Sequence, residues 1–156
     1  MNIRYGTQED ANKYGKYLKE MWLMHVDKEP DFVNREIIEQ SDLKGYFENC
    51  FNGSNKSYLF IAEENGEFAG LCKVNIEEIQ KFFNQTTIIY IDDIYVKEEY
   101  RGKGVGNLLI TQVEVLAKQK GIKWLKARIY TFNNQAQSLF KKNNFKPLYS
   151  EYFKTL

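Results

Sequence analysis

The sequence predicts an α/β domain in which helices cover a mixed β-sheet. Two observations carry this prediction: runs with the two-residue period of strands alternate along the chain with runs at helical spacing, and no linker, repeat or low-complexity tract interrupts them. A chain of 156 residues is long enough to bury a core without disulfides or metal. We therefore expect a single domain over residues 1–156, with elements in the order β-α-α-β-β-β-α-β-α-β.

The first third of the chain reads as a strand followed by helices. Residues 2–5 form a short strand, and Thr7 with Asp10 three positions later is typical of a helix N-terminus. The apolar residues that follow recur at helical spacing; they are Ala11, Tyr14, Leu18 and Met21. A second helical region runs from about 34 to 51, and Ser41-Asp42 can split it in two.

The middle of the chain reads as three strands. Residues 57–62 and 68–76 flank the segment 64–67, whose Asn-Gly pair suits the tight turn of an antiparallel hairpin. A polar stretch then leads into residues 86–96, whose Ile, Tyr and Val indicate a buried central strand.

The last third alternates helix and strand. Apolar residues keep helical spacing from Val105 to Leu116, and Gly121 stops that helix. Residues 124–130 alternate as a strand does. Asn133 or Asn134 can cap a short helix that ends near Asn144, and residues 145–154 supply the last strands.

Bulk composition argues against several classes of partner. The net charge is +1 and no Lys/Arg block is present, so we expect no nucleic-acid partner. Cys50, Cys72 and the single histidine, His25, are too few and too scattered for a metal cluster, so we expect no metal. No apolar run reaches the roughly 20 residues of a membrane span, and no signal peptide opens the chain. These observations predict a cytoplasmic protein with free thiols and no membrane partner.

The segment Arg101-Gly102-Lys103-Gly104-Val105-Gly106 lies between the central strand and a helix. The first N–H groups of that helix have no internal partners, and the glycines, the helix dipole and two basic side chains all favour a pyrophosphate there. A P-loop is excluded because Asn107 and Leu108 replace its lysine and hydroxyl. A dinucleotide fingerprint fails as well, because Asn107 holds its last glycine position.

This segment matches the Arg/Gln-x-x-Gly-x-Gly/Ala signature of the GNAT acetyltransferases. The preceding residues 90–96 resemble their fourth strand, and Asn133-Asn134-Gln135-Ala136, Leu139-Phe140 and Asn144-Phe145 resemble a later block of the family. The resemblance is strongest over residues 86–146, and residues before 57 resemble the family only in outline. The resemblance implies a GNAT fold, with a mixed, mostly antiparallel sheet of six to seven strands flanked by about four helices.

The resemblance also implies a site for acetyl-CoA as co-substrate. In this family the fourth and fifth strands part and the pantetheine arm lies between them, beside the backbone of residues 94–96, while the N–H groups of residues 102–107 hold the pyrophosphate. Asn133 would contact the arm from the other side, or it is a plain helix cap. The residues expected to bind acetyl-CoA are Ile94, Tyr95, Val96, Arg101, Gly102, Lys103, Gly104, Val105, Gly106, Asn107, Asn133, Ala136 and Phe140.

Catalysis is expected at two acids in the central strand. Asp92 and Asp93 should point to opposite faces of that strand, so at most one faces the substrate. By resemblance to polyamine-type members we expect Asp92 to be the general base, directly or through water. The other reading is that both acids anchor loops or pair with Lys or Arg. Asp92, Asp93 and His25 form the expected acceptor site, and the stretch His25…Pro30…Phe32 resembles the acceptor end of some members.

One position departs from the family pattern. Where many GNAT enzymes have a tyrosine that protonates the leaving thiolate, this chain has Phe140, and Tyr130, Tyr149 or Tyr152 are the candidate replacements. The sequence therefore predicts an N-acetyltransferase for a primary amine, with a small amine such as a polyamine, aminoglycoside or amino acid favoured over a protein. The alternative is a non-catalytic acyl-CoA sensor. A homodimer would be usual for the family.

Overall fold

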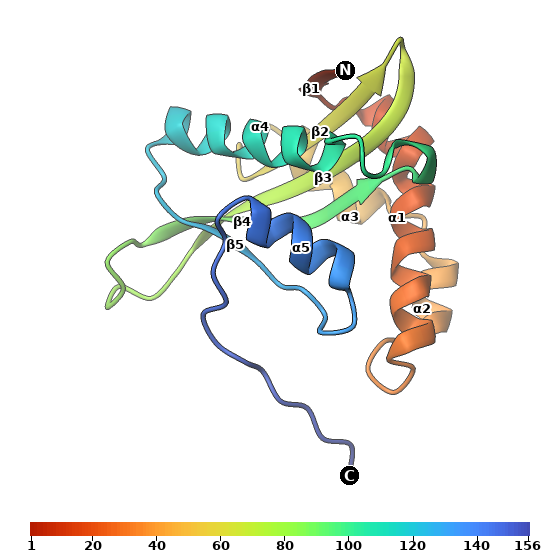
Figure 1. The fold of residues 1–156 in the computed structure, drawn as a ribbon, viewed down its shortest axis with the longest axis vertical. Coiled ribbons are helices and arrows are strands. Elements are labelled where there is room, and N and C mark those ends of the chain that lie inside the picture. The colour runs from red at the N-terminus through yellow and green to blue at the C-terminus, as the bar shows by residue number, and fades with distance from the viewer.

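The computed structural model describes residues 1–156 and contains one five-stranded sheet with the strand order β1-β2-β3-β4-β5 (Figure 1). All neighbouring strands are antiparallel except β4 and β5, which are parallel. In chain order the elements are β1 (Asn2–Tyr5), α1 (Gln8–Lys28), α2 (Arg35–Gln40), α3 (Lys44–Phe51), β2 (Ser57–Glu64), β3 (Glu67–Glu78), β4 (Thr87–Val96), a 3-10 turn (Glu98–Tyr100), α4 (Val105–Lys120), β5 (Leu125–Ala127) and α5 (Asn134–Lys142). The α/β fold class is confirmed.

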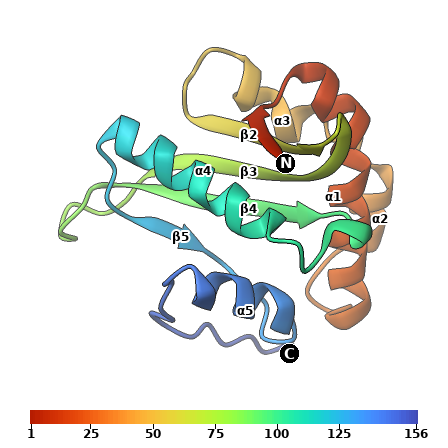
Figure 2. The ribbon, with the colours of Figure 1, turned by 45° about the horizontal axis from the view of Figure 1, so that its top comes forward.

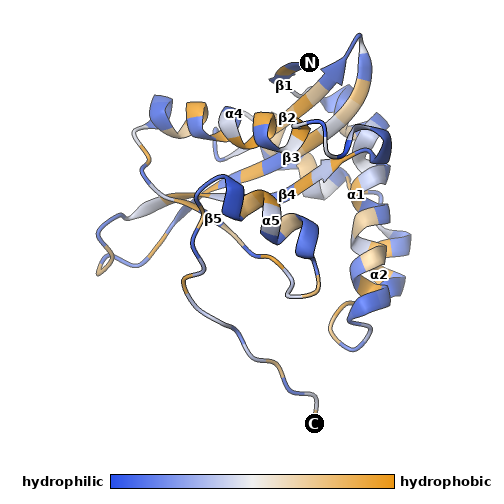
Figure 3. Ribbon diagram, in the orientation of Figure 1, coloured by the Kyte–Doolittle hydropathy of each residue, from blue (hydrophilic) through white to orange (hydrophobic).

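The sheet separates two apolar cores. Helix α4 covers one face, and α1 and α3 cover the other (Figure 2). Strand β2 shows why: Phe60 and Ala62 pack toward α4, whereas Leu59 and Ile61 pack toward Leu18 and its neighbours, because successive side chains of a strand alternate. Apolar residues gather along β2 to β4 and recur at intervals along α4 (Figure 3). No helix has both the length and the apolar character that crossing a bilayer requires.

Several local predictions are confirmed. Thr7 and Asp10 form a reciprocal capping box at the start of α1. Asn65 and Gly66 both have positive φ, 53° and 82°, as the tight turn between β2 and β3 requires. The helical region 34–51 is split at residues 41–43 into α2 and α3.

The predicted strand count is wrong. The sheet has five strands rather than six to seven, the chain has five α-helices rather than about four, and β5 is shorter than the predicted 124–130. Residues 145–154 form no strand: after the bond from Phe145 N to Phe140 O, no backbone hydrogen bond joins this segment to the sheet. Pro147 supplies no N–H for a ladder, and Tyr152 and Leu148 are almost fully exposed. The segment extends away from the sheet (Figure 1).

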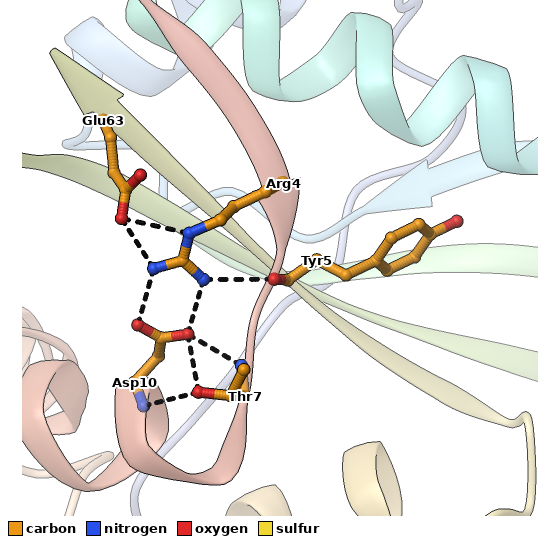
Figure 4. Close-up of polar contacts among 5 residues, drawn as sticks. All are labelled: Arg4, Tyr5, Thr7, Asp10 and Glu63. Atoms are coloured by element: carbon orange, nitrogen blue, oxygen red, sulfur yellow. Dashed lines mark hydrogen bonds and ion pairs between the residues drawn. The ribbon is translucent and has the colours of Figure 1, made fainter. Parts of the chain in front are cut away.

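A cluster of ions fastens the first strand to the first helix and to β2 (Figure 4). Arg4 donates hydrogen bonds to both carboxylate oxygens of Asp10, at 2.6 and 2.8 Å, and to Glu63 at 2.6 and 3.0 Å. Asp10 also accepts bonds from the backbone and hydroxyl of Thr7. The guanidinium and these bonds lower the pKa of the buried Asp10 to about 2.

This cluster predicts a loss of stability in acid. The pKa of Asp10 is lower in the folded than in the unfolded chain, so its contribution of about 2 kcal/mol is present above the unfolded value and is lost as pH falls from about 4 to 2. Urea unfolding at a series of pH values should show Asp10→Asn less stable than the wild type near neutral pH, with the gap closing over that range. Asp31→Asn, at an exposed position, should show no gap. A gap that does not change with pH would contradict the assignment.

Candidate active site

Strands β4 and β5 part soon after they meet. They pair only from Ile89 to Ile91, opposite Leu125 to Ala127, although β4 continues to Val96. The β5 side of β4 therefore lacks a neighbouring strand over residues 92–96, and the chain beyond Ala127 leaves the sheet. The predicted parting of the two central strands is present in the structure.

A cleft of about 410 Å³ lies beside this gap. Its walls come from α1, the α2–α3 region, β4, the segment after β5 and α5, and most of its lining is apolar or aromatic. Seven of the residues expected to bind acetyl-CoA or the acceptor lie in it: His25, Asp92, Asp93, Ile94, Asn133, Ala136 and Phe140. Tyr130, a candidate for the missing acid, lies in it as well. The backbone of β4 and the start of α5 thus meet at one cavity, as the sequence analysis expected.

The prediction that Asp92 and Asp93 point to opposite faces is wrong. Lys73 on β3 is opposite Asp93, but the next residue, Val74, is opposite Ile91, so Asp92 is an extra residue in a β-bulge. The bulge breaks the alternation of side chains. Both carboxylates line the cleft, and the hydroxyl of Tyr46 on α3 lies within hydrogen-bonding distance of both.

Asp92 is held through one of its oxygens. Its Oδ2 accepts from Lys73 Nζ at 2.6 Å, from Tyr46 Oη at 2.9 Å and from Asn75 Nδ2 at 3.0 Å. Ser57 in turn donates to Asn75 at 2.8 Å. No hydrogen bond within the protein uses Asp92 Oδ1, and the side chain is 25% exposed. Asp92 thus pairs with a lysine, as its alternative reading had it, and also presents an open carboxylate oxygen at the cleft.

Asp93 is more deeply buried, with 8% exposure. Its Oδ1 accepts from the indole N–H of Trp22 at 2.8 Å, and its Oδ2 contacts Tyr46. Burial raises the pKa of Asp93, and the donor groups Tyr46 and Trp22 oppose that shift only in part. The two neighbouring acids therefore have different surroundings: Asp92 has a cation, and Asp93 does not.

Sequence reasoning missed Lys73, Tyr46 and Trp22. Lys73 had a signal, because it interrupts the apolar run Leu71 to Val74 of a predicted inner strand, and a charge that becomes buried there requires a partner. Its ammonium also lies 3.9 Å from the centre of the Tyr46 ring. Tyr46 and Trp22 had no such signal, since aromatic residues at helical spacing are usual in a core.

The N-terminus of α4 presents unpaired backbone donors. The first helical bond runs from Leu108 N to Gly104 O at 3.1 Å, and the amides of residues 104–107 have no acceptor within the protein. Gly104 has φ +87° and caps the helix, and no atom lies within 4 Å of the position a Cβ would take. The four N–H groups are therefore left without a partner in the protein.

The remaining residues of the glycine-rich segment have separate roles. Gly106 is buried, and a Cβ there would lie 2.9 Å from Leu139, so the close packing of α4 on α5 explains this third glycine. The side chain of Val105 is in the core. Arg101 donates from Nε to the carbonyl of Val96 at 3.1 Å, while Lys103 is exposed.

Comparisons with known proteins decide the family. A family model described as "Acetyltransferase (GNAT) family" matches residues 20–145. The chain belongs to this family. It is 36% identical over 146 residues to thialysine N-epsilon-acetyltransferase of Sus scrofa, a match that covers 89% of this chain and 80% of that protein.

Two solved structures have the same GNAT fold. A mutant of the BH1408 protein of Bacillus halodurans matches with a TM-score of 0.86 at 19% identity, over 100% of this chain and 99% of the other. A predicted acetyltransferase of Clostridium acetobutylicum, solved with acetyl-CoA, matches with a TM-score of 0.72 at 20% identity, over 99% and 95%. The predicted family, fold class and enzyme class are confirmed.

The part of the cleft around His25 is aromatic. His25 donates from Nδ1 to the carbonyl of Met21 at 2.7 Å, which leaves Nε2 as an acceptor when the ring is neutral. The imidazole lies 4.7 Å from the ring of Tyr130 and 5.5 Å from that of Phe132. His25 thus lines the cleft and packs, with its ring tilted, against Tyr130 on the opposite wall.

The three candidate replacements for the missing GNAT tyrosine differ in position. Tyr130 lines the cleft, and burial raises its pKa, so the phenol keeps its proton. Tyr149 and Tyr152 are 66% and 94% exposed and do not line it. Phe140 is buried, with its ring edge-on to Phe145. Asn133 caps α5 by accepting from Ala136 N at 3.0 Å, so its reading as a helix cap is confirmed.

Proposed function

We propose that this GNAT protein moves the acetyl group of acetyl-CoA to the primary amine of a small molecule. One observation carries the proposal: Asp92 is ionically paired through Oδ2 and open through Oδ1, in a cleft beside the gap between β4 and β5. An open carboxylate oxygen binds an ammonium group and accepts its proton. A pocket of about 410 Å³ is of the size that binds small molecules.

The chain's own groups fit acetyl-CoA. The unpaired amides of residues 104–107, the dipole of α4 and the exposed side chains of Arg101 and Lys103 suit the pyrophosphate. The edge of β4 at residues 94–96 has no neighbouring strand on the β5 side, which suits the pantetheine arm, although Val96 O already accepts a hydrogen bond from Arg101. The Clostridium acetobutylicum neighbour, which has this fold, was solved with acetyl-CoA, and that supports the choice of co-substrate.

The proposed reaction moves two protons off the acceptor nitrogen and replaces the C–S bond of the thioester with a C–N bond. The acceptor ammonium binds at Asp92 Oδ1 and gives one proton to it. The amine nitrogen then attacks the thioester carbonyl, a C–N bond forms and the C–S bond breaks. The leaving thiolate takes a proton from an acid in the cleft, the second proton of the nitrogen returns to that acid, and the proton on Asp92 passes to solvent. The products are the acetylated amine, the CoA thiol and a proton. Tyr130 is the phenol in the cleft that can supply the thiolate's proton. Backbone N–H groups of β4 are suited to stabilise the oxyanion.

The acceptor is proposed to be a small amine rather than a protein lysine. Aromatic side chains crowd the cleft, among them Trp22, Tyr90 and Tyr130, and they suit the body of a compact amine. The porcine relative is named for thialysine, itself a small amine, and this supports the same class. A cytoplasmic location and a homodimer belong to the same proposal, and sedimentation velocity tests the dimer.

A screen of acetyl-CoA turnover tests the proposal. Polyamines, aminoglycosides, amino acids and peptides are offered as acceptors, and release of free CoA is measured. We expect turnover with a small amine. Binding of acetyl-CoA without CoA release from any amine would instead support the acyl-CoA sensor, which Phe140 favours because it has no proton to give.

Phe140→Tyr is expected to keep the fold and to raise turnover by no more than about tenfold. A thiol with a pKa of about 8.5 leaves fairly well without an acid, so the gain appears only if thiolate departure limits the rate. Initial rates and thermal unfolding of the variant provide the check. The placement of Phe140 beside the thioester would be wrong if this variant changed neither turnover nor acetyl-CoA affinity while Tyr130→Phe abolished activity.

A further inference from the structure

Tyr46 contacts two carboxylates with a single proton. Its hydroxyl oxygen lies 2.9 Å from Asp92 Oδ2 and also within hydrogen-bonding distance of Asp93 Oδ2. A phenol donates one hydrogen bond only. If both acids were ionised, one of these contacts would bring two lone pairs together in a buried site, which is unfavourable.

No other hydrogen-bond donor near the two acids supplies the missing proton. Lys73 and Asn75 both donate to Asp92 Oδ2. Trp22 donates to Asp93 Oδ1, so the Oδ2 of Asp93 has no partner except Tyr46. Lys73 is the cation of the cluster, and its ion pair is with Asp92. The count of donors and acceptors is thus short by one proton, and that proton belongs on the Asp93 side.

We propose that Asp93 is a neutral carboxylic acid in the resting protein, with its proton on Oδ2. Asp93 then donates to Tyr46, Tyr46 donates to Asp92, and Asp92 is the anion that pairs with Lys73. Each of the two contacts of the Tyr46 hydroxyl then contains one proton, and the charges of Lys73 and Asp92 cancel. Asp93 is a positioning residue that acts on Asp92 through Tyr46.

The groups around Asp93 agree with this assignment. Trp22 and His25 face the acids from α1, Tyr46 and Cys50 from α3, and Lys73 from β3, while Arg128 and Tyr130 line the opposite wall of the cleft. Cys72, next to Lys73, packs in the core on the other face of the sheet. Burial raises the pKa of Asp93, and the charge of Asp92 adds to this shift; together they outweigh the contacts with Tyr46 and Trp22 and the charge of Lys73, which lower that pKa. Burial and both acids also raise the pKa of Tyr46 far above its usual value, so the phenol keeps its proton. Burial likewise raises the pKa of Cys72 and keeps it a neutral thiol.

The arrangement presents one negative charge to the acceptor from a pair of acids. It also fixes which oxygen is presented, because Lys73, Asn75 and Tyr46 hold Asp92 Oδ2 and leave Oδ1 free. This consequence for the acceptor rests on the proposed acetyl transfer. The protonation of Asp93 does not rest on acetyl transfer, so either proposal can fail without the other.

Carbon-13 NMR of protein labelled at the aspartate carboxyls measures the proton directly. Asp93→Asn and Asp92→Asn assign the two signals. At a pH where the signal of the exposed Asp31 shows full ionisation, we expect the Asp93 carboxyl at the chemical shift of a protonated acid and Asp92 at that of an anion. An ionised Asp93 signal at that pH would overturn the proposal.

Tyr46→Phe gives a second test whose sign decides the direction of the hydrogen bond. If Asp93 donates to Tyr46, that bond stabilises the protonated acid, so its loss moves the titration of Asp93 to lower pH. A move to higher pH would mean that Tyr46 donates to an ionised Asp93, and the proposal would be wrong. Tyr58→Phe is the matched control, because its hydroxyl bonds Asn55 O outside the cleft, and it should leave the Asp93 signal in place.

The kinetic test compares two substitutions of Asp93, with the acceptor found in the turnover screen. Asp93→Asn supplies an amide N–H where the acid has its O–H, so turnover should fall by less than about tenfold. Asp93→Leu has no donor for Tyr46, so its turnover should fall further. A loss of about 10² or more in Asp93→Asn would show that the charge of Asp93 is required and would overturn the proposal. If the wild type turns over no amine, the proposed function fails while the NMR result still decides where the proton lies.

Discussion

Asp92→Asn is expected to lower acetyl-transfer turnover by about 10² to 10⁴, the usual contribution of a positioned base, with acetyl-CoA affinity changed by less than about twofold. The amide keeps the shape of the side chain but removes the charge that binds the acceptor ammonium and takes its proton. Acetyl-CoA affinity should be spared, because the unpaired amides proposed to hold its pyrophosphate lie in residues 104–107, outside the Asp92 cluster. Initial rates and calorimetric titration with acetyl-CoA measure the two quantities.

The same substitution leaves Lys73 buried without its counterion, so stability must be followed too. Removing one partner of a buried ion pair typically costs about 3–5 kcal/mol. The double variant Lys73→Met/Asp92→Asn removes both charges and should recover stability without recovering turnover. Asp42→Asn, at an exposed position, is the matched control. Recovery of turnover in the double variant, or a larger loss in Asp93→Asn than in Asp92→Asn, would show that Asp92 is not the base.

The parts of the fold that the sequence predicted are those with local causes. The capping box of Thr7 and Asp10 and the turn at Asn65-Gly66 depend on residues within a few positions of each other. The array of unpaired amides at Gly104 is also local, since it needs only a helix N-terminus after a strand. These features can therefore be predicted from one sequence.

The acid cluster could not be predicted in the same way, because its causes are not local. The bulge at Asp92 arises in the pairing of β4 with β3, and no property of residues 90–96 alone places it. Tyr46 reaches the acids from a helix 46 and 47 positions away in the chain. The predicted final strand is absent for a related reason. Residues 145–154 are rich in aromatic residues, as many strands are, but a strand also requires a partner edge, and β5 has only three residues.

Gly104→Val is expected to weaken acetyl-CoA binding by about tenfold or more. A hydrogen bond to a charged group is worth about 1.5–3 kcal/mol, and the new side chain would stand in the open space beside the unpaired amides of α4. The substitution also costs stability, about 1–2 kcal/mol, because a β-branched residue disfavours φ +87°. Affinity must therefore be measured on protein shown to be folded, by calorimetry below the unfolding temperature.

Gly121→Val is the control that separates these two effects. Gly121 has φ +68°, no atom lies within 4 Å of its Cβ position, and it ends the same helix at the opposite terminus. Its substitution should cost similar stability but leave acetyl-CoA affinity unchanged, since only the N-terminus of α4 has free N–H groups. Added salt should weaken binding to the wild type more than to Gly104→Val, because the affected contact is with a charged phosphate. Unchanged affinity in folded Gly104→Val, or an equal loss in both variants, would exclude this turn as the pyrophosphate site.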